Sequence, residues 1–254
     1  MLKIVRLFGL VVVMGLPGTA IAQGDLAVSA FNEGRYSEAR ALASDSDADA
    51  MAFRAKVLLS EAISGDNGLS DALLTQALQA ADASLALEPD HADARLQRSL
   101  AISLATRAMT AREVQKSDLV DEAKATVESL LAEDETNVYA HMFLSVWHLE
   151  VWRRGGRIGA IAMGANRKTA RAHYTAAAAL ADDDASIHWQ YGKALAALNA
   201  RKYKDEINIV LDKAIAAEAE TALEQTMQAR AKTLKNAMAS KPRREVEDLA
   251  AAMN

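Results

Sequence analysis

The chain contains no cysteine and has little proline, glycine or aromatic side chain. Its 254 residues include 3 Pro and 12 Gly, and aromatic residues make up 5%. Without cysteine it can form no disulfide, thiolate nucleophile or cysteine-based metal site. Because helix-breaking residues are rare, long regular helices are available to it. The hydrophobic share of 51% and the charged share of 25% are typical of a globular protein.

The N-terminal residues have the pattern of a secretory signal peptide. Two basic residues precede an apolar run at 7–16, and "AIA" at 20–22 has the small-x-small form of a cleavage site. We therefore predict a signal peptide over 1–22 and a mature chain that begins at Gln23, located in the periplasm or secreted. An uncleaved anchor helix is the alternative. No later segment has the roughly 18 apolar residues of a membrane span, so none is expected after cleavage.

The mature chain repeats itself. Apolar residues recur at helical spacing, and four similar segments each carry an acidic turn, a helix start and then a small residue. The small residues lie 44, 46 and 47 positions apart: Ala55, Ser99, Ser145 and Gly192. A small side chain at such a position allows two helices of a pair to approach closely.

Two further motifs extend this pattern. "FNEGRYSEARALA" at 31–43 contains Gly-x-Tyr-x-x-Ala, in which the glycine ends one helix and the tyrosine packs into the joint. "LALEPDHADA" at 85–94 resembles the repeat junction of the tetratricopeptide repeat (TPR) family, where the proline ends one helix and starts the next repeat. The resemblance covers roughly 25–217. The family period is 34 residues, and the repeats here are longer between the two helices of each pair, most of all at 152–168.

The resemblance implies an all-α fold, a right-handed α-solenoid of about five TPR-like antiparallel helix pairs in a domain over 23–239. A C-terminal capping helix is expected at 219–239, followed by a tail at 240–254 that forms a last turn or frays. The other helices are predicted at 24–33, 36–43, 48–64, 70–87, 91–110, 117–133, 137–153, 167–180, 185–199 and 203–217.

No arrangement of residues indicates catalysis. Of the 5 histidines, His141 and His148 lie two helical turns apart, too far to share one metal ion without an intervening ligand. Gly159 and Gly164 have the spacing of a phosphate loop, but Ala165 follows where the motif requires lysine. The zinc-protease motif and the serine elbow are also absent. We therefore expect no enzyme, no cofactor and no metal.

A basic segment interrupts an acidic chain of net charge −5. From 151 to 181 there are six basic residues and no acidic one. Such a segment fits an anionic partner or a membrane surface. In the alternative interpretation, two arginines end a helix, where cations suit the dipole, and the others solvate a loop. Nucleic acid is not expected, because the chain is acidic and carries an export signal. The candidate contact residues are Trp152, Arg153, Arg154 and Arg157.

The TPR resemblance also implies a concave face formed by the first helix of each pair. If its apolar side chains are exposed, they form a groove for a peptide, a helix or a small amphiphile. If 152–168 or the C-terminal helix covers them, they are core. Aligning the small residues places Leu96 and Leu100 on this face, together with the candidate partner-binding residues Tyr139, Met142, Val146, Trp189 and Lys193.

The function implied by the resemblance is that of a non-enzymatic periplasmic scaffold or adapter for protein–protein interaction. The alternative is an accessory protein of solute uptake, which binds a small amphiphilic ligand or a substrate-binding protein. That alternative predicts an enclosed apolar pocket beneath 152–168. The sequence does not identify the partner, and it allows a homo-oligomer. The path of 152–168 distinguishes a lid over the concave face from an outward docking loop.

Overall fold

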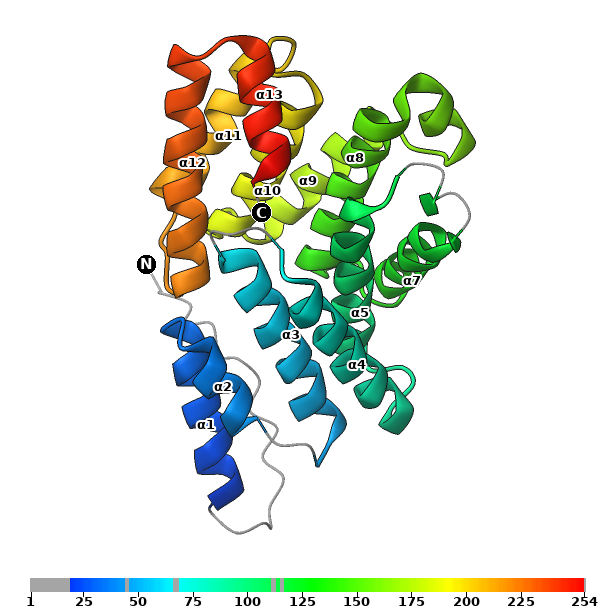
Figure 1. Cartoon of the computed structure of the whole chain (residues 1–254), viewed down its shortest axis with the longest axis vertical. Helices are drawn as coiled ribbons and strands as arrows, with labels where there is room; N and C mark the ends of the chain where they lie inside the picture. The colour runs from blue at the N-terminus through cyan, green and yellow to red at the C-terminus, as the bar shows by residue number, and fades with distance from the viewer. Residues whose placement is uncertain (1–18, 44–45, 66–68, 111–112, 115–116, 254) are drawn as a thin grey trace.

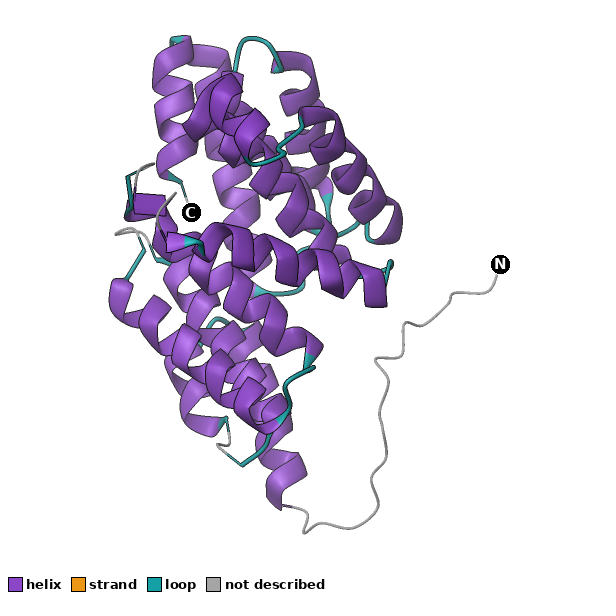
Figure 2. Ribbon diagram, turned by 90° about the vertical axis from the view of Figure 1, so that its right-hand side faces the viewer, coloured by secondary structure: helices purple, strands orange, loops and turns teal. Residues whose placement is uncertain are grey.

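The computed structural model describes residues 19–43, 46–65, 69–110, 113–114 and 117–253, and in these ranges all regular structure is helical (Figure 2). The predicted all-α class is confirmed. Residues 1–18 of the predicted signal peptide lie outside these ranges, and 19–22 begin the first helix. Within the described part, no helix combines the length and apolarity needed to cross a membrane.

The elements are α1 (Thr19–Asn32), α2 (Tyr36–Leu42), α3 (Ala48–Ser64), α4 (Asp71–Leu87), α5 (Ala92–Ala105), the 3-10 turn η1 (Thr106–Ala108), α7 (Leu119–Glu133), α8 (Val138–Ala162), α9 (Arg167–Leu180), α10 (Ala185–Asn199), α11 (Lys204–Ala216), α12 (Ala222–Ser240) and α13 (Arg243–Ala252).

Side chains in the turns begin many of these helices. A capping side chain satisfies one of the backbone N–H groups that lack a partner in the first turn. At α12 the cap is reciprocal, because Thr221 accepts from the backbone of Glu224 while the Glu224 carboxylate accepts from the backbone of Thr221. The polar turns between helices therefore act as helix starts. Single side-chain caps are made by Asp47, Ser70, His91, Asn137, Asn166 and Asp184.

Helices that are neighbours in sequence pack together in pairs: α1 with α2, α3 with α4, α5 with α7, α8 with α9, and α10 with α11. Contacts also join α4 with α5, α3 with α5, and α8 with α10. Two of the small residues lie where a pair is closest. The buried hydroxyl of Ser145 donates to the carbonyl of Ala170 in α9 at 2.9 Å. A Cβ on Gly192 would lie only 2.9 Å from a methyl group of Val210 in α11.

Helix α8 is longer than the sequence predicts. The predicted helix ends at residue 153, whereas α8 reaches Ala162 with one break at Gly156, where φ is 59° and ψ is −157°. A positive φ of this kind favours glycine. The chain then turns at Gly164, with φ 68°, into α9. The predicted insertion at 152–168 is therefore largely helical and folds back on itself; we call it the hairpin.

The C-terminal residues form part of the core, not the predicted tail. Residues 243–252 are helix α13, which packs on α10, and its Val246 and Ala250 are each only 2% exposed. Helix α12 packs on α10 and α11 and also contacts α1 and α3. Figure 1 shows α12 directly above α1 and α2, at the opposite side of the molecule from the hairpin. The predicted boundary at 239 therefore does not separate a folded domain from a tail.

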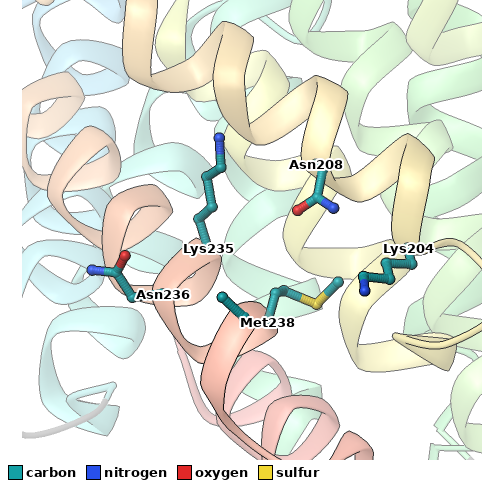
Figure 3. Close-up of a pocket in the computed structure, with 6 residues that line it drawn as sticks. Lys204, Asn208, Lys235, Asn236 and Met238 are labelled. Carbon is teal, nitrogen blue, oxygen red and sulfur yellow. The ribbon is translucent and has the colours of Figure 1, made fainter.

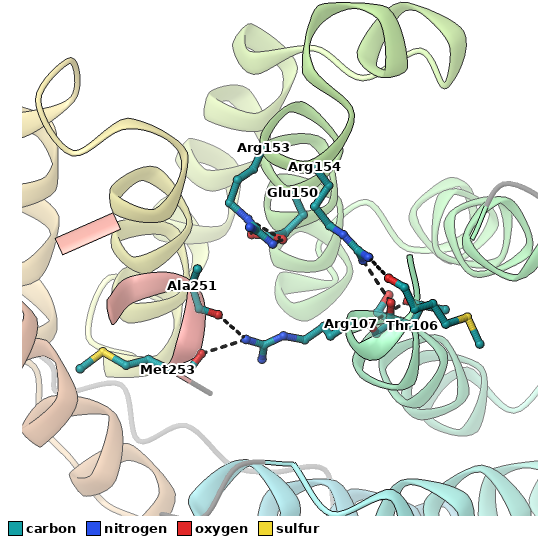
Figure 4. Close-up of polar contacts among 9 residues, drawn as sticks. Thr106, Arg107, Glu150, Arg153, Arg154, Ala251 and Met253 are labelled. Carbon is teal, nitrogen blue, oxygen red and sulfur yellow. Dashed lines mark hydrogen bonds and ion pairs between the residues drawn. The ribbon is translucent and has the colours of Figure 1, made fainter. Parts of the chain in front are cut away.

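Two arginines join helix ends that are far apart in sequence. Arg230 of α12 donates to the three carbonyl groups of 63–65, at the end of α3, over 2.8, 3.3 and 3.3 Å. Arg107 of η1 donates to the carbonyls of Ala251 and Met253, at the end of α13, over 2.9 and 3.1 Å (Figure 4). A guanidinium there satisfies carbonyls that have no partner within their helix and complements the helix dipole. The C-terminal helices are thus tied back to α3 and η1.

Candidate docking site

The structure buries most of the predicted groove. Met142 is 6% exposed and Trp189 is 0% exposed, and Val146 packs against the same core cluster. That cluster also contains Met227 of α12 and Val246 of α13. The two C-terminal helices therefore cover the side of α10 on which an open groove was considered. The alternative, in which these apolar residues are core, holds for Met142, Val146 and Trp189.

The other two predicted groove residues have polar roles. Tyr139, which is 52% exposed, donates from its hydroxyl to Asp184 at 3.0 Å. The ammonium of Lys193 lies 5.7 Å from the centre of the Trp189 ring. Burial, together with repulsion from Arg107, lowers the pKa of Lys193 to about 7. Of the five predicted groove residues, Tyr139 alone is well exposed.

The hairpin is anchored at its base by Trp152. The indole N–H of Trp152 donates to the carbonyl of Ala165 at 3.1 Å, and the guanidinium of Arg167 lies 4.2 Å from the centre of the indole ring. Ala160 and Ala165 are buried, at 0% and 8% exposure. These contacts hold the short helical piece after Gly156 against the start of α9, so the hairpin is a packed unit.

Two of the predicted arginines make structural contacts, one within α8 and one that ties the hairpin to the residues around η1. The guanidinium of Arg153 forms a bidentate pair with Glu150, with its closest contact at 2.7 Å. Arg154 donates to the carbonyl of Thr106 at 3.1 Å and to the carbonyl of Met109 (Figure 4). Arg157, by contrast, is exposed. The predicted basic set is thus split between structural contacts and the outer surface.

Two isoleucines at the tip of the hairpin were not among the predicted site residues. Ile158 is 85% exposed and Ile161 is 70% exposed, the highest values among the large hydrophobic residues of the described chain. They lie three positions apart and therefore on the same side of a helical turn. Arg157, which precedes Ile158, is exposed, and so is Lys168 in the first turn of α9. The sequence signal that could have identified them is their i, i+3 spacing, which places two large apolar residues on one side of a short helical segment between Gly156 and Gly164.

The hairpin points outward. Figure 1 shows it projecting from the end of α8, at the upper right, on the side away from α12 and α13. It is therefore not a lid over α10. Its exposed side chains include Arg157 and the two isoleucines, Ile158 and Ile161.

Two open hollows on the described surface lie elsewhere. One, of about 440 Å³, surrounds Gly34 at the turn between α1 and α2. The other, of about 410 Å³, lies between α11 and α12 (Figure 3), where Lys235 is paired with Asp212. Neither contains a predicted site residue. The second hollow is lined by Lys204, Asn208, Lys235, Asn236, Met238 and Ala239.

Three histidines of α8 and α9 form a cluster below the hairpin. The Nδ1 atoms of His141 and His173 are 2.9 Å apart, and the His148 ring stacks on His173 with centres 6.1 Å apart. His148 accepts through Nδ1 from the backbone N–H of Asn166 at 3.2 Å. Burial lowers the pKa of His148 to about 4 and also lowers the pKa of His173. His173 thus stands between the two histidines that the sequence placed too far apart to act together. Across the described residues, no three histidine, aspartate or glutamate side chains gather closely enough to hold a metal ion.

Comparison with known proteins gives no match, whether with protein-family models, with curated sequences or with solved structures. The function of the protein is therefore inferred from its own residues and their geometry.

Proposed function

We propose that this protein is a non-enzymatic scaffold of the TPR-like type, exported to the periplasm, that binds a protein partner through the hairpin. The observation that carries the proposal is the pair of exposed isoleucines, Ile158 and Ile161, on a protrusion that Trp152 anchors. Exposed apolar side chains that are rimmed by polar ones mark sites of interaction. Anchoring lowers the entropy lost on binding, which favours affinity.

The pairing of helices along the chain supports an α-solenoid of about five TPR-like pairs, right-handed as in that family, with α12 and α13 as its cap. In such arrays, insertions within a repeat fall on one face, which often binds the partner. The hairpin is an insertion of this kind, between the two helices of the fourth pair. The same architecture supports a binding function over a catalytic one.

The charge of the hairpin suggests the chemistry of the partner. Six basic residues and no acidic one occur from 151 to 181, and two of those in the hairpin, Arg157 and Lys168, are exposed. A complementary protein surface would have carboxylates around an apolar pocket that accepts Ile158 and Ile161. Association with such a surface would slow as the salt concentration rises.

The proposed export is compatible with the packing of α1. Cleavage before Gln23 would leave the buried residues of this helix, Ala27, Ala30 and Phe31, in the mature chain. The alternative role in solute uptake through a small amphiphile needs an apolar cavity beneath the hairpin. Ala160, Ala165 and Trp152 occupy that position, which favours docking of a protein.

The test compares the mature chain with the double variant Ile158→Ser/Ile161→Ser. Each is cross-linked in periplasmic extract, and captured proteins are quantified by mass spectrometry. We expect at least one protein to be captured by the wild type and lost with the double variant, and to be reduced by Arg157→Glu and by high salt. Ile209→Ser is the matched control, because Ile209 on α11 is 61% exposed but lies outside the hairpin. Capture that is equal for the wild type and the double variant would refute hairpin docking.

A further inference from the structure

We propose that His141 and His173 form a binding site for a late divalent transition-metal ion, Cu²⁺ in preference to Zn²⁺, between α8 and α9. The two Nδ1 atoms converge to 2.9 Å from two different helices. Both side chains are partly exposed, so an ion in solution can reach them. Imidazole nitrogen is a preferred ligand of copper, nickel and zinc. The site is independent of the proposed docking function.

The hydrogen bonds of His141 leave its Nδ1 ready to coordinate. Its Nε2 lies 3.0 Å from the carbonyl oxygen of Glu135. Because a carbonyl oxygen only accepts, Nε2 carries the ring proton, and Nδ1 of neutral His141 has its lone pair directed toward His173. A backbone carbonyl that accepts from the second ring nitrogen is the usual support of a metal-bound histidine. His173 offers its own Nδ1 lone pair once its ring proton moves to Nε2.

The spacing of the two nitrogens allows both to reach one ion. Their separation of 2.9 Å is that of an N–H···N hydrogen bond between the rings. With metal–nitrogen bonds of about 2.0–2.1 Å, two ligands of one ion lie about 2.9 Å apart at 90° and about 3.3 Å apart at the tetrahedral angle, so an ion that replaces the shared proton needs little change in their separation. The choice of ion follows from affinity, because Cu²⁺ binds nitrogen sites more tightly than Ni²⁺ or Zn²⁺ does.

The surroundings hold His173 in place and leave the site open. The ring of His148 stacks on His173, and its own Nδ1 is occupied by the backbone N–H of Asn166. On α7, the carboxylate of Glu128 lies near enough to favour the charged form of His173 and pairs with Lys124 at 2.6 Å. Because the described residues supply no group of three ligands, water would complete the coordination. The bound ion would therefore be exchangeable, unlike the ion of a closed four-ligand structural site.

The experiment uses the mature chain without a histidine tag, titrated with Cu²⁺, Ni²⁺ and Zn²⁺ by calorimetry. We expect one equivalent of Cu²⁺ to bind, more tightly than Ni²⁺ or Zn²⁺. His141→Ala and His173→Ala should each weaken Cu²⁺ binding at least tenfold. His91→Asn is the control, because asparagine can replace the helix cap that His91 provides.

Spectroscopy of the wild-type protein tests the same site even if the alanine variants do not fold. Electron paramagnetic resonance of the Cu²⁺ complex should show coupling to two imidazole nitrogens, and nuclear magnetic resonance should show selective broadening of the His141 and His173 rings. Cu²⁺ binding that is unchanged in both alanine variants, coupling to no imidazole, or absence of binding by the wild type would each overturn the proposal.

Discussion

At the scale of the residue, Gly192 sets the distance between two helices by lacking a side chain. A Cβ there would lie 2.9 Å from a methyl group of Val210 and 3.1 Å from one of Leu211, closer than atoms in contact normally come. Gly192→Ala must therefore displace the side chains of Val210 and Leu211 or push α10 and α11 apart. We expect it to lower the free energy of unfolding by about 1–3 kcal/mol, as overpacking of a core does, in urea denaturation.

Gly159→Ala is the matched control. No atom lies within 4 Å of a Cβ built on Gly159, in the helical part of the hairpin. Since alanine has the higher helix propensity, by up to about 1 kcal/mol, this variant should be neutral or slightly more stable. A similar loss from both substitutions would show that helix–helix contact is not the reason for glycine at 192.

Lys193 couples stability to pH. Its pKa of about 7 lies well below the ordinary value of 10.5, chiefly because of burial. Between these two values the unfolded chain binds more protons than the folded one, so the free energy of unfolding rises with pH. The destabilising contribution of Lys193 is thus absent above the ordinary pKa, grows as the pH falls toward 7 and is constant below it. Lys193→Met should remove it.

The measurement is the difference in unfolding free energy between Lys193→Met and the wild type at pH 7, 8 and 9. Comparing the two proteins cancels titration of other groups. We expect the variant to be the more stable at pH 7 and its advantage to shrink as the pH rises. An advantage that does not change with pH would mean that the methionine acts through packing alone.

At the scale of the element, the hairpin depends on Trp152. Trp152→Ala removes the hydrogen bond to the Ala165 carbonyl and the stacking surface for Arg167. The short helical piece should then separate from α9, and trypsin should cleave after the exposed Arg157 several-fold faster. Limited proteolysis followed by mass spectrometry measures this rate. Tyr139→Ala, which alters an exposed aromatic residue elsewhere on α8, should leave it unchanged; equal acceleration would assign the effect to α8 as a whole.

Local signals predicted most helices, because the residues that start and stop them are neighbours in sequence. Helix α3 is predicted and found at 48–64, between the Asp47 cap and Gly65. Helix α13 was missed because a ten-residue amphipathic segment is marginal until packing stabilises it. The extension of α8 crosses glycines at 155, 156 and 159, which lower helix propensity, and burial of Ala160 compensates for them.

The candidate site was harder to predict than the helices. Whether Trp189 lines a groove or fills a core depends on the path of α12 and α13, which no pattern around 189 contains. The basic stretch did indicate the hairpin, but it could not show that Arg154 turns inward to the carbonyl of Thr106. Ile158 and Ile161 resemble core residues until the direction of the hairpin is known.

At the scale of the whole molecule, Arg230 joins α12 to the end of α3, which is far away in the sequence. Arg230→Gln replaces charged hydrogen bonds to the carbonyls of 63–65 by at most neutral ones. We expect a loss of about 2–3 kcal/mol in the free energy of unfolding, with faster hydrogen exchange at the end of α3 and in α12. Arg244→Gln, at an exposed position on α13, should change neither quantity. Equal losses of stability in Arg230→Gln and Arg244→Gln would mean that the packing of α12 against α3 does not depend on the Arg230 contact.

The contacts of Arg230 and Arg107 also order events in time. They join residues up to 167 positions apart. A ribosome that adds roughly 5–20 residues per second needs roughly 8–30 s to cover such an interval. Throughout that delay the carbonyls at the end of α3 lack the guanidinium of Arg230, and α10, once it is made, is covered only after α12 and α13 follow. Completion of this fold is therefore a terminal event of biosynthesis, and a chain that stops short of residue 230 would remain an unclosed intermediate.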